Sequence, residues 1–312
     1  MYQTFIKSLD ELNGIVLNFN NDGLLFMNIT IAFIMFGVAL EIKIDNFKKI
    51  LAKPKSAIIG IFSQFLLLPA ITFLLVWIIQ PSSAVALGMI LVAACPGGNI
   101  SNFMSALAKG NIALSVSLTA FATSFSVILT PFNFIFWGEL YMKSIQLEKP
   151  MEIPILQVFQ TVFILLGLPL IAGIWFSSKF PKTTQRIMKT VKIASIIVFI
   201  GFIAGALAAN FDNFIKYVYL VIPIVLIHNL LAFFTGFSVS KLFRLPNIDV
   251  KTITIETGIQ NSGLALVLIF NHKIFPPGMG GIAFIAAWWG IWHIISGLVI
   301  SFIWSKSKAV SK

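Results

Sequence analysis

Charge is scarce in this chain: only 11% of its 312 residues are Asp, Glu, Lys or Arg. Apolar residues make up 58%, and the polar segments between apolar runs are at most about 20 residues long. This composition excludes a soluble catalytic domain and is typical of a polytopic membrane protein. The single cysteine, Cys95, excludes an intrachain disulfide.

Sequence signatures of enzymes are also missing. The spans contain no HExxH motif, no GxSxG motif and no paired catalytic carboxylates, so we predict that the protein is not an enzyme. No cleavable signal peptide is expected, because Asp10 and Glu11 interrupt the first 20 residues. Nothing in the sequence indicates an obligatory protein partner; the lipid bilayer is the expected surrounding.

We predict an all-α fold with nine transmembrane helices of about 20 residues or more each. Residues 1–23 are expected to lie at the membrane interface, 24–304 to form the transmembrane domain and 305–312 to form a cytoplasmic tail. The nine predicted spans are 24–41, 55–79, 84–108, 111–137, 152–176, 190–209, 215–241, 250–271 and 280–304.

The net charge of +11 reflects topology rather than nucleic-acid binding, because the basic residues alternate between the two sides of these spans. One side carries 17 of the 22 Lys and Arg residues. The other side carries Lys7, Lys143, Lys149, Lys216 and Lys273. The positive-inside rule places the N-terminus outside and the C-terminus in the cytoplasm. For a bacterial source, the inner membrane is the expected location.

Two predicted spans have a polar, helix-breaking centre. The third contains Pro96, Gly97 and Gly98, and the eighth contains a polar run framed by Gly258 and Gly263. Proline removes a main-chain donor, and glycine adopts backbone angles that end a helix. Main-chain groups freed at this depth can coordinate a cation or face an anion.

The positions of these breaks suggest inverted repeats. Spans 1–4 and 6–9 form two blocks of opposite orientation, because span 5 separates them, and the broken helix is third in each block. Two discontinuous helices would then cross near the membrane midplane. The alternative is that both breaks are kinks that only help helices to pack.

Glu256 is the acidic residue that we place near the midplane. A carboxylate there costs about 2.5–3.5 kcal/mol on insertion scales, and no Lys or Arg lies within one helical turn of it. A bound cation would be a natural partner. Protonation of the buried carboxyl is the alternative and would indicate proton coupling.

The chain resembles the bile acid:sodium symporter family from about residue 30 to residue 304. The motifs that carry the resemblance are Cys95–Asn102, Lys109–Ser115, Glu256–Gly263 and Trp292–Gly297. The resemblance implies a core domain with two crossed, broken helices (spans at 55–137 and 215–304) and a smaller panel domain (spans at 24–41 and 152–209).

The resemblance also implies two sodium sites built from oxygen ligands, which hard cations prefer. The residues implied for the first site are Ser101, Asn102, Ser115, Thr119 and Glu256. Those implied for the second site are Gln64, Gln260, Glu256 and the main-chain carbonyls of Thr257 and Ile259. Alternatively, Ser and Thr hydroxyls can bond their own helix, and Gln64 can be structural.

An organic anion is the implied substrate. Asn99 and Asn261 follow the two breaks, near half-helix ends that favour negative charge, and the resemblance points Asn261 and His293 toward a substrate cavity. A structural hydrogen bond is the alternative for His293, and we favour one for His228 and Asn229.

The predicted function is sodium-coupled import of a bile acid-like anion or a small carboxylate such as pantoate, by alternating access. A proton-coupled or efflux transporter on the same scaffold is the alternative.

Overall fold

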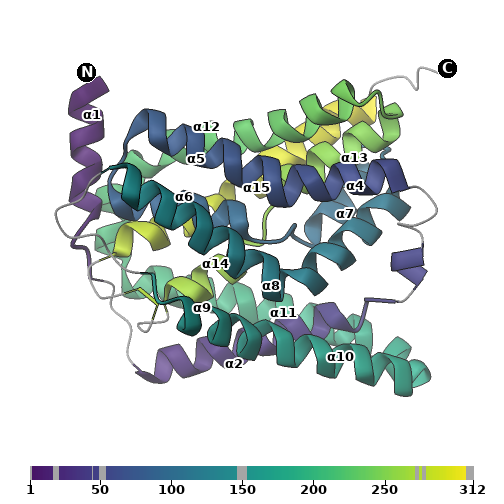
Figure 1. Cartoon of the computed structure of the whole chain (residues 1–312). Coiled ribbons are helices and arrows are strands. Elements are labelled where there is room, and N and C mark those ends of the chain that lie inside the picture. The colour runs from purple at the N-terminus through teal and green to yellow at the C-terminus, as the bar shows by residue number, and fades with distance from the viewer. Residues whose placement is uncertain are drawn as a thin grey trace.

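The computed structural model describes residues 2–16, 21–43, 45–48, 54–145, 153–270, 274–275 and 279–306 (Figure 1). Residues 17–20 of the predicted interfacial segment and 307–312 of the predicted tail lie outside these ranges. The described residues form helices and no strand. In chain order, the helices are α1 (Tyr2–Ser8), η1 (Leu9–Leu12), α2 (Asn21–Ala39), α4 (Pro54–Phe62), η2 (Ser63–Leu67), α5 (Leu68–Ile79), α6 (Ser83–Ala94), α7 (Ile100–Leu107), α8 (Ile112–Ser144), α9 (Ile155–Val162), η3 (Phe163–Gly167), α10 (Leu168–Lys179), α11 (Pro181–Ala209), α12 (Phe211–Leu242), α13 (Asn247–Gly258), α14 (Ser262–Ile269) and α15 (Gly280–Lys306).

Five helical stretches among the described residues are long and apolar enough to cross a membrane. They are Pro54–Ile79, Ile112–Ser144, Ile155–Lys179, Phe211–Leu242 and Gly280–Lys306. Their outer faces expose large apolar side chains such as Ile58, Phe132 and Phe234, each more than half exposed. Such faces need lipid around them, because a water-soluble protein would bury side chains of this size.

Two of the long stretches widen into a π-helical turn in the middle. Each π turn, η2 and η3, is followed by a Leu-Pro pair, Leu68-Pro69 in the first and Leu168-Pro169 in the second. A proline has no N–H and its ring clashes with the carbonyl of the preceding turn, so a wider turn relieves both problems. The stretch therefore continues as one helix past the proline.

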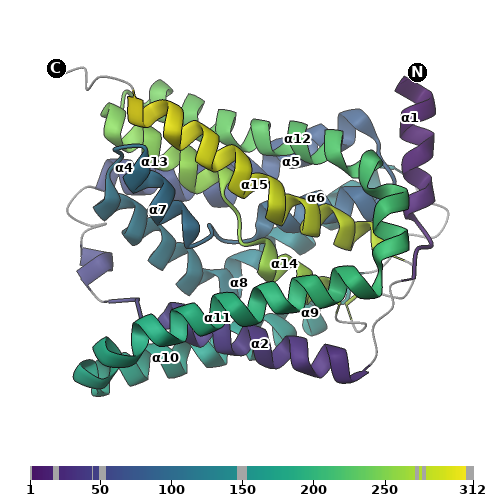
Figure 2. The ribbon, with the colours of Figure 1, turned by 180° about the vertical axis from the view of Figure 1, so that it is seen from behind.

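Helices α2, α10 and α11 lie side by side at one edge of the molecule, away from α4, α5 and α15 (Figures 1 and 2). Glycines bring these three helices close together. A Cβ atom added at Gly173 of α10 would lie 2.5 Å from the Cβ of Ala39 in α2, and one at Gly37 of α2 would lie 3.1 Å from Val191 in α11. Small residues at such contacts are typical of helix packing in membranes.

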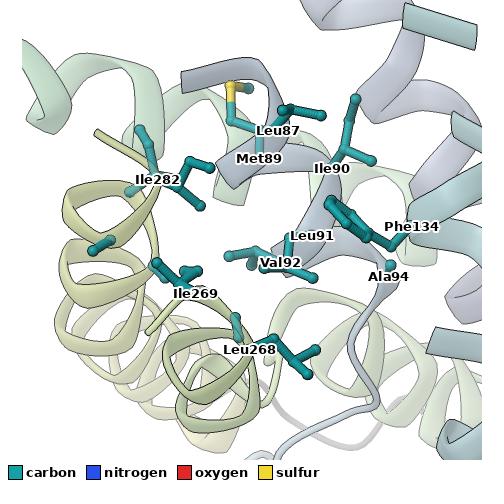
Figure 3. Packing of buried hydrophobic residues seen from close by; sticks show 14 of the residues in the cluster. Leu87, Met89, Ile90, Leu91, Val92, Ala94, Phe134, Leu268, Ile269 and Ile282 are labelled. Carbon is teal, nitrogen blue, oxygen red and sulfur yellow. The ribbon is translucent and has the colours of Figure 1, made fainter. Parts of the chain in front are cut away.

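Helix α6 is the most deeply buried element. Its residues from Ala84 to Ala94 are all buried, and Figure 3 shows its side chains surrounded by those of neighbouring helices. Phe134 comes from α8, Leu268 from α14 and Ile282 from α15. Protein rather than lipid therefore covers this apolar helix, and α6 lies within the molecule.

The N-terminal segment packs against the beginnings of α6 and α15. Leu9 and Leu12 are fully buried. The Asn13 side-chain oxygen accepts a hydrogen bond from the main-chain N–H of Ala84 (3.2 Å), and the carbonyl of Ile15 accepts one from Gly280 (2.9 Å). These contacts satisfy main-chain donors in the first turns of two helices, where no intrahelical partner exists.

Candidate functional site

The two predicted breaks contact each other. Helix α6 ends at Ala94 and α7 begins at Ile100, while α13 ends at Gly258 and α14 begins at Ser262. The main-chain N–H of Gly98 donates to the carbonyl of Ile259 (2.9 Å), and that of Asn261 donates to the carbonyl of Pro96 (2.8 Å). Each break therefore supplies main-chain partners that the other has lost.

Glycine permits this approach. A Cβ atom added at Gly98 would lie 3.3 Å from the carbonyl oxygen of Gln260, and one at Gly97 would lie 3.2 Å from Glu256 Oε2. Both distances are tighter than ordinary contacts, so a side chain at Gly98 would force a shift between the two breaks, and one at Gly97 would crowd the Glu256 carboxylate.

Glu256 lies beside this crossing and is only 4% exposed. Three hydroxyl groups donate to its carboxylate. Ser101 of α7 donates to Oε1 (2.7 Å), Ser115 of α8 also donates to Oε1, and Thr119 of α8 donates to Oε2 (3.1 Å). Residues 115 and 119 are four apart and so lie on one face of α8. The structure thus gathers residues from α7, α8 and α13.

Asn102 completes this group. Its side-chain oxygen lies 2.9 Å from the Ser115 hydroxyl and 3.2 Å from the Thr119 hydroxyl. The five residues predicted for the first sodium site are therefore brought together, and their side chains offer six oxygens. We call these five residues the Glu256 cluster.

The residues predicted for the second site are also neighbours. Gln64, in the π turn η2, donates from Nε2 to Gln260 Oε1 (2.8 Å) and to the carbonyl of Cys95 (3.2 Å). Gln260 donates to the carbonyl of Thr257 (2.7 Å), and the carbonyl of Ile259 accepts from Gly98. The Oε1 atom of Gln64 is buried and accepts no hydrogen bond from the described residues.

No Lys or Arg among the described residues forms a salt bridge with Glu256. The ion pairs found join Lys48 to Asp45 and Lys143 to Glu139. Lys251, five residues before Glu256, donates instead to the carbonyls of Ala108 (2.9 Å) and Trp304 (3.2 Å) near helix C-termini. Groups of three or more His, Cys, Asp and Glu, which could hold a transition metal, are absent from the described residues.

The residues predicted for the substrate do not form one hydrogen-bonded group within the described part of the chain. Asn99 directly precedes α7 and Asn261 precedes α14, where the Asn261 side-chain oxygen accepts from Leu264 N–H (3.1 Å). Both asparagines are partly exposed, whereas His293 of α15 is 5% exposed. His293 Nδ1 is buried and has no partner among the described residues.

His228 and Asn229 contact neighbouring helices. His228 Nε2 lies 2.8 Å from the Thr72 hydroxyl, and its ring packs on Trp289 at 4.6 Å between centroids. Asn229 donates to the carbonyl of Gly258 (2.8 Å) and accepts from Ser296 (2.6 Å). These bonds link α12 to α5, α13 and α15, in keeping with a structural role.

A second buried carboxylate was missed by the sequence analysis. Asp249 of α13 is 2% exposed and accepts hydrogen bonds from Ser56 Oγ (2.6 Å) and Asn111 Nδ2 (2.7 Å). The available signal was its spacing: Asp249, Thr252 and Glu256 are three and four residues apart and share one face of α13.

Similar proteins are named as transporters. The chain is 32% identical over 281 residues to the "Uncharacterized sodium-dependent transporter YocS" of Bacillus subtilis, covering 90% of this chain and 83% of that one. It is 29% identical over 256 residues to the "Probable sodium/metabolite cotransporter BASS2, chloroplastic" of rice, covering 79% and 57%. It is 27% identical over 240 residues to the rat "Sodium/bile acid cotransporter 5", covering 75% and 52%.

The chain thus spans just over half the length of the rice and rat proteins and most of the length of the Bacillus protein. Such relatives, together with the long apolar helices, mark it as an integral membrane transporter rather than an enzyme. The family model described as "Sodium Bile acid symporter family" matches residues 28–217, which is more than half of the sequence. The chain belongs to the sodium bile acid symporter family.

Proposed function

We propose that this protein is a sodium-coupled symporter that imports an organic anion by alternating access. Nine membrane spans would be formed by α2, α4–α5, α6/α7, α8, α9–α10, α11, α12, α13/α14 and α15. The interrupted spans α6/α7 and α13/α14 would cross at their breaks, as inverted repeats do at a central binding site.

The observation that carries this proposal is the composition of the Glu256 cluster. Its three hydroxyl groups have one proton each, and they face a carboxylate and an amide oxygen that can accept more bonds than three. A group of six oxygens with a buried negative charge and no basic side chain suits a hard cation. Sodium would supply the missing positive charge.

A second sodium ion would bind at Gln64 and Gln260. The unpartnered Gln64 Oε1 needs a cation or a donor, because a buried acceptor without one costs about 1–3 kcal/mol. The carbonyls of Thr257 and Ile259 already accept one hydrogen bond each, but a carbonyl oxygen has a second lone pair. Glu256 would be shared between the two ions.

The anion would lie where the half-helices α7 and α14 begin. Helix N-termini carry partial positive charge, and Asn99 and Asn261 stand at these two starts. Because Asn261 uses its side-chain oxygen to cap α14, its amide group is left to face a ligand. His293 would line the same cavity. The names of the rice and rat relatives fit an organic substrate, either bile acid-like or a small carboxylate such as pantoate.

Alternating access would move the core against a panel formed by α2, α9–α10 and α11. Support comes from the layer of α2, α10 and α11 at one edge of the fold (Figures 1 and 2). The N-terminus would be outside and the C-terminus cytoplasmic, following the basic residues. Each sodium entering with the membrane potential contributes about 2.3 kcal/mol per 100 mV.

Thermal unfolding of the purified protein in detergent, titrated with sodium or with potassium, tests this function. A ligand that binds only the folded state raises the unfolding temperature by mass action. We expect a sodium-specific rise in the wild type that is lost in Glu256→Ala and kept in Glu139→Ala, which changes a partly exposed carboxylate paired with Lys143. A response to pH that needs Glu256, with none to sodium, would instead support proton coupling.

A further inference from the structure

We propose that Asp249 is a positioning residue that sets sodium affinity by holding α4, α8 and α13 in register. The inference rests on the proposed sodium-coupled function. Asp249 lies outside both predicted sodium sites, yet its side chain bonds to two of the other helices that carry their ligands, the continuous helix α4–η2 and the start of α8. The group formed by Asp249, Asn111, Ser56 and Thr252 is called the Asp249 latch below.

The carboxylate of Asp249 is satisfied by two donors from other helices. Oδ1 accepts from the Asn111 amide just before α8 (2.7 Å), and Oδ2 accepts from the Ser56 hydroxyl of α4 (2.6 Å). Because one of these partners is an amide N–H that would repel a cation, the group is suited to joining helices rather than to binding an ion.

Asn111 is fixed on three sides. Its side-chain oxygen accepts from Leu114 N–H and so caps α8 (3.1 Å). Its main-chain N–H donates to the Thr252 hydroxyl (2.8 Å) and lies 3.2 Å from the carbonyl of Ile248. The preceding Gly110 has no room for a side chain, since a Cβ atom there would lie 2.7 Å from the Thr252 hydroxyl. The start of α8 is therefore held against α13.

The latch and the Glu256 cluster occupy the same helix–helix contact. Asn111, the N-cap of α8, and Ser115 and Thr119 within α8 recur every four residues and share one face. On α13, Asp249 and Glu256 are seven residues, or about 10 Å, apart on one face. Asn111 meets Asp249, and Ser115 meets Glu256. A slide or rotation of α8 along α13 would therefore break both contacts together.

The bond between Ser56 and Asp249 connects the latch to the second predicted sodium site. Ser56 lies eight residues before Gln64 in the continuous helix formed by α4 and η2. Its bond to Asp249 fixes the start of this helix against α13, which carries Thr257. At the π turn the same two helices meet again, where the hydroxyls of Ser63 and Thr257 lie 2.8 Å apart. Asp249 thus connects the elements of both sites.

Exchanging the side chains of Asn111 and Asp249, one at a time and then together, separates the effect of their hydrogen bond from the effect of their charge. In Asn111→Asp, two carboxylates would face each other and the bond would be lost, although an aspartate still caps α8. We expect the half-saturating sodium concentration in the thermal titration to rise about tenfold. In Asp249→Asn, the amide can still accept from Asn111 and donate to Ser56, so we expect a change of less than about threefold.

The double variant Asn111→Asp/Asp249→Asn restores an amide–carboxylate pair in reverse. We expect its half-saturating sodium concentration to return to within about threefold of the wild type, which a generally damaged protein would not show. Thr254→Val is the matched control, because that buried hydroxyl donates to Val250 of its own helix (2.7 Å). It should leave the half-saturating concentration unchanged.

A purely structural latch would lower the unfolding temperature in potassium while leaving the half-saturating sodium concentration unchanged. That result for Asn111→Asp would overturn the inference and leave the proposed function intact. If Asn111→Asp does not fold, Thr252→Val is a milder change, because Asn111 N–H loses its hydroxyl acceptor but keeps the carbonyl of Ile248. The half-saturating sodium concentration of Thr252→Val is then expected to rise about threefold, and an unchanged concentration would overturn the inference. A wild type with no sodium response would overturn the proposed function as well.

Discussion

Glu256 and Asn102 share the hydroxyl groups of Ser115 and Thr119. Ser115 lies within hydrogen-bond reach of Glu256 Oε1 and of Asn102 Oδ1, and Thr119 lies 3.1 Å from Glu256 Oε2 and 3.2 Å from the same Asn102 oxygen. Each hydroxyl has one proton and can donate to only one of them at a time. The oxygens that remain without a proton are the ones that a cation would satisfy.

Thr119→Val should weaken sodium binding about tenfold, because it removes one ligand oxygen and leaves Glu256 Oε2 without its donor. The half-saturating sodium concentration in thermal unfolding measures this. Ser117→Ala on the same helix is the control, since its buried hydroxyl donates to Ala113 of its own turn (2.7 Å). Equal sodium affinities in the two variants would count against a sodium role for Thr119.

Gln64→Leu should remove the second sodium ion while keeping the side-chain volume. Uptake measured against sodium concentration should then lose its cooperativity, with the Hill coefficient falling from near two toward one. The first ion should still stabilise the protein, because the Glu256 cluster contains no atom of Gln64. A Hill coefficient that stays near two would contradict the assignment of Gln64.

Variants of Asn261 can separate its capping of α14 from its proposed role in substrate binding. Asn261→Asp retains an acceptor for Leu264 N–H but adds a negative charge that should repel an anionic substrate. We expect a rise of tenfold or more in KM for the anion at saturating sodium, with the sodium-dependent thermal shift kept. Asn261→Ala should weaken substrate binding less than Asn261→Asp does. It should also lower the unfolding free energy by about 1 kcal/mol, because α14 loses its side-chain cap. An unchanged KM in Asn261→Asp would argue against a substrate role.

The contact between α12 and α13 depends on a glycine. A Cβ atom at Gly236 would lie 2.8 Å from the carbonyl oxygen of Ile253 and 2.9 Å from the Cα of Thr254, and neither main-chain atom can move aside easily. Gly236→Ala should therefore destabilise the protein by about 1–3 kcal/mol, seen as a lower unfolding temperature in potassium. Gly201→Ala should not destabilise the protein, because a Cβ atom added at Gly201 would have no atom of another segment within 4 Å.

The sequence predicts local features of this protein better than contacts between distant segments. Apolar runs placed the helices, and the Pro and Gly residues placed both interruptions within a few residues. The four-residue spacing put Ser115 and Thr119 on one face, but their contact with Glu256, some 140 residues later, followed only from a family resemblance. No local pattern encodes such a contact.

The remaining features were not predictable for physical reasons. Asp249 directly precedes the predicted span 250–271, where an acidic residue is ordinarily solvated, and its burial depends on contacts with Ser56 and Asn111 from two other helices. The π turn before Pro69 is a second example, because a proline within a helix is compatible with both a kink and a π turn. Tertiary packing decides between them.

The pairing of the two breaks has a consequence for biosynthesis. The Pro96 carbonyl and the Gly98 N–H, which would lie deep in the bilayer, are bonded to Asn261 and Ile259, about 160 residues later in the chain. At roughly 5–20 residues per second, the ribosome needs about 8–30 s to produce these partners. During that interval water, lipid headgroups or the insertion machinery must satisfy the first break, so the N-terminal half of the protein cannot complete its fold before the C-terminal half has been made.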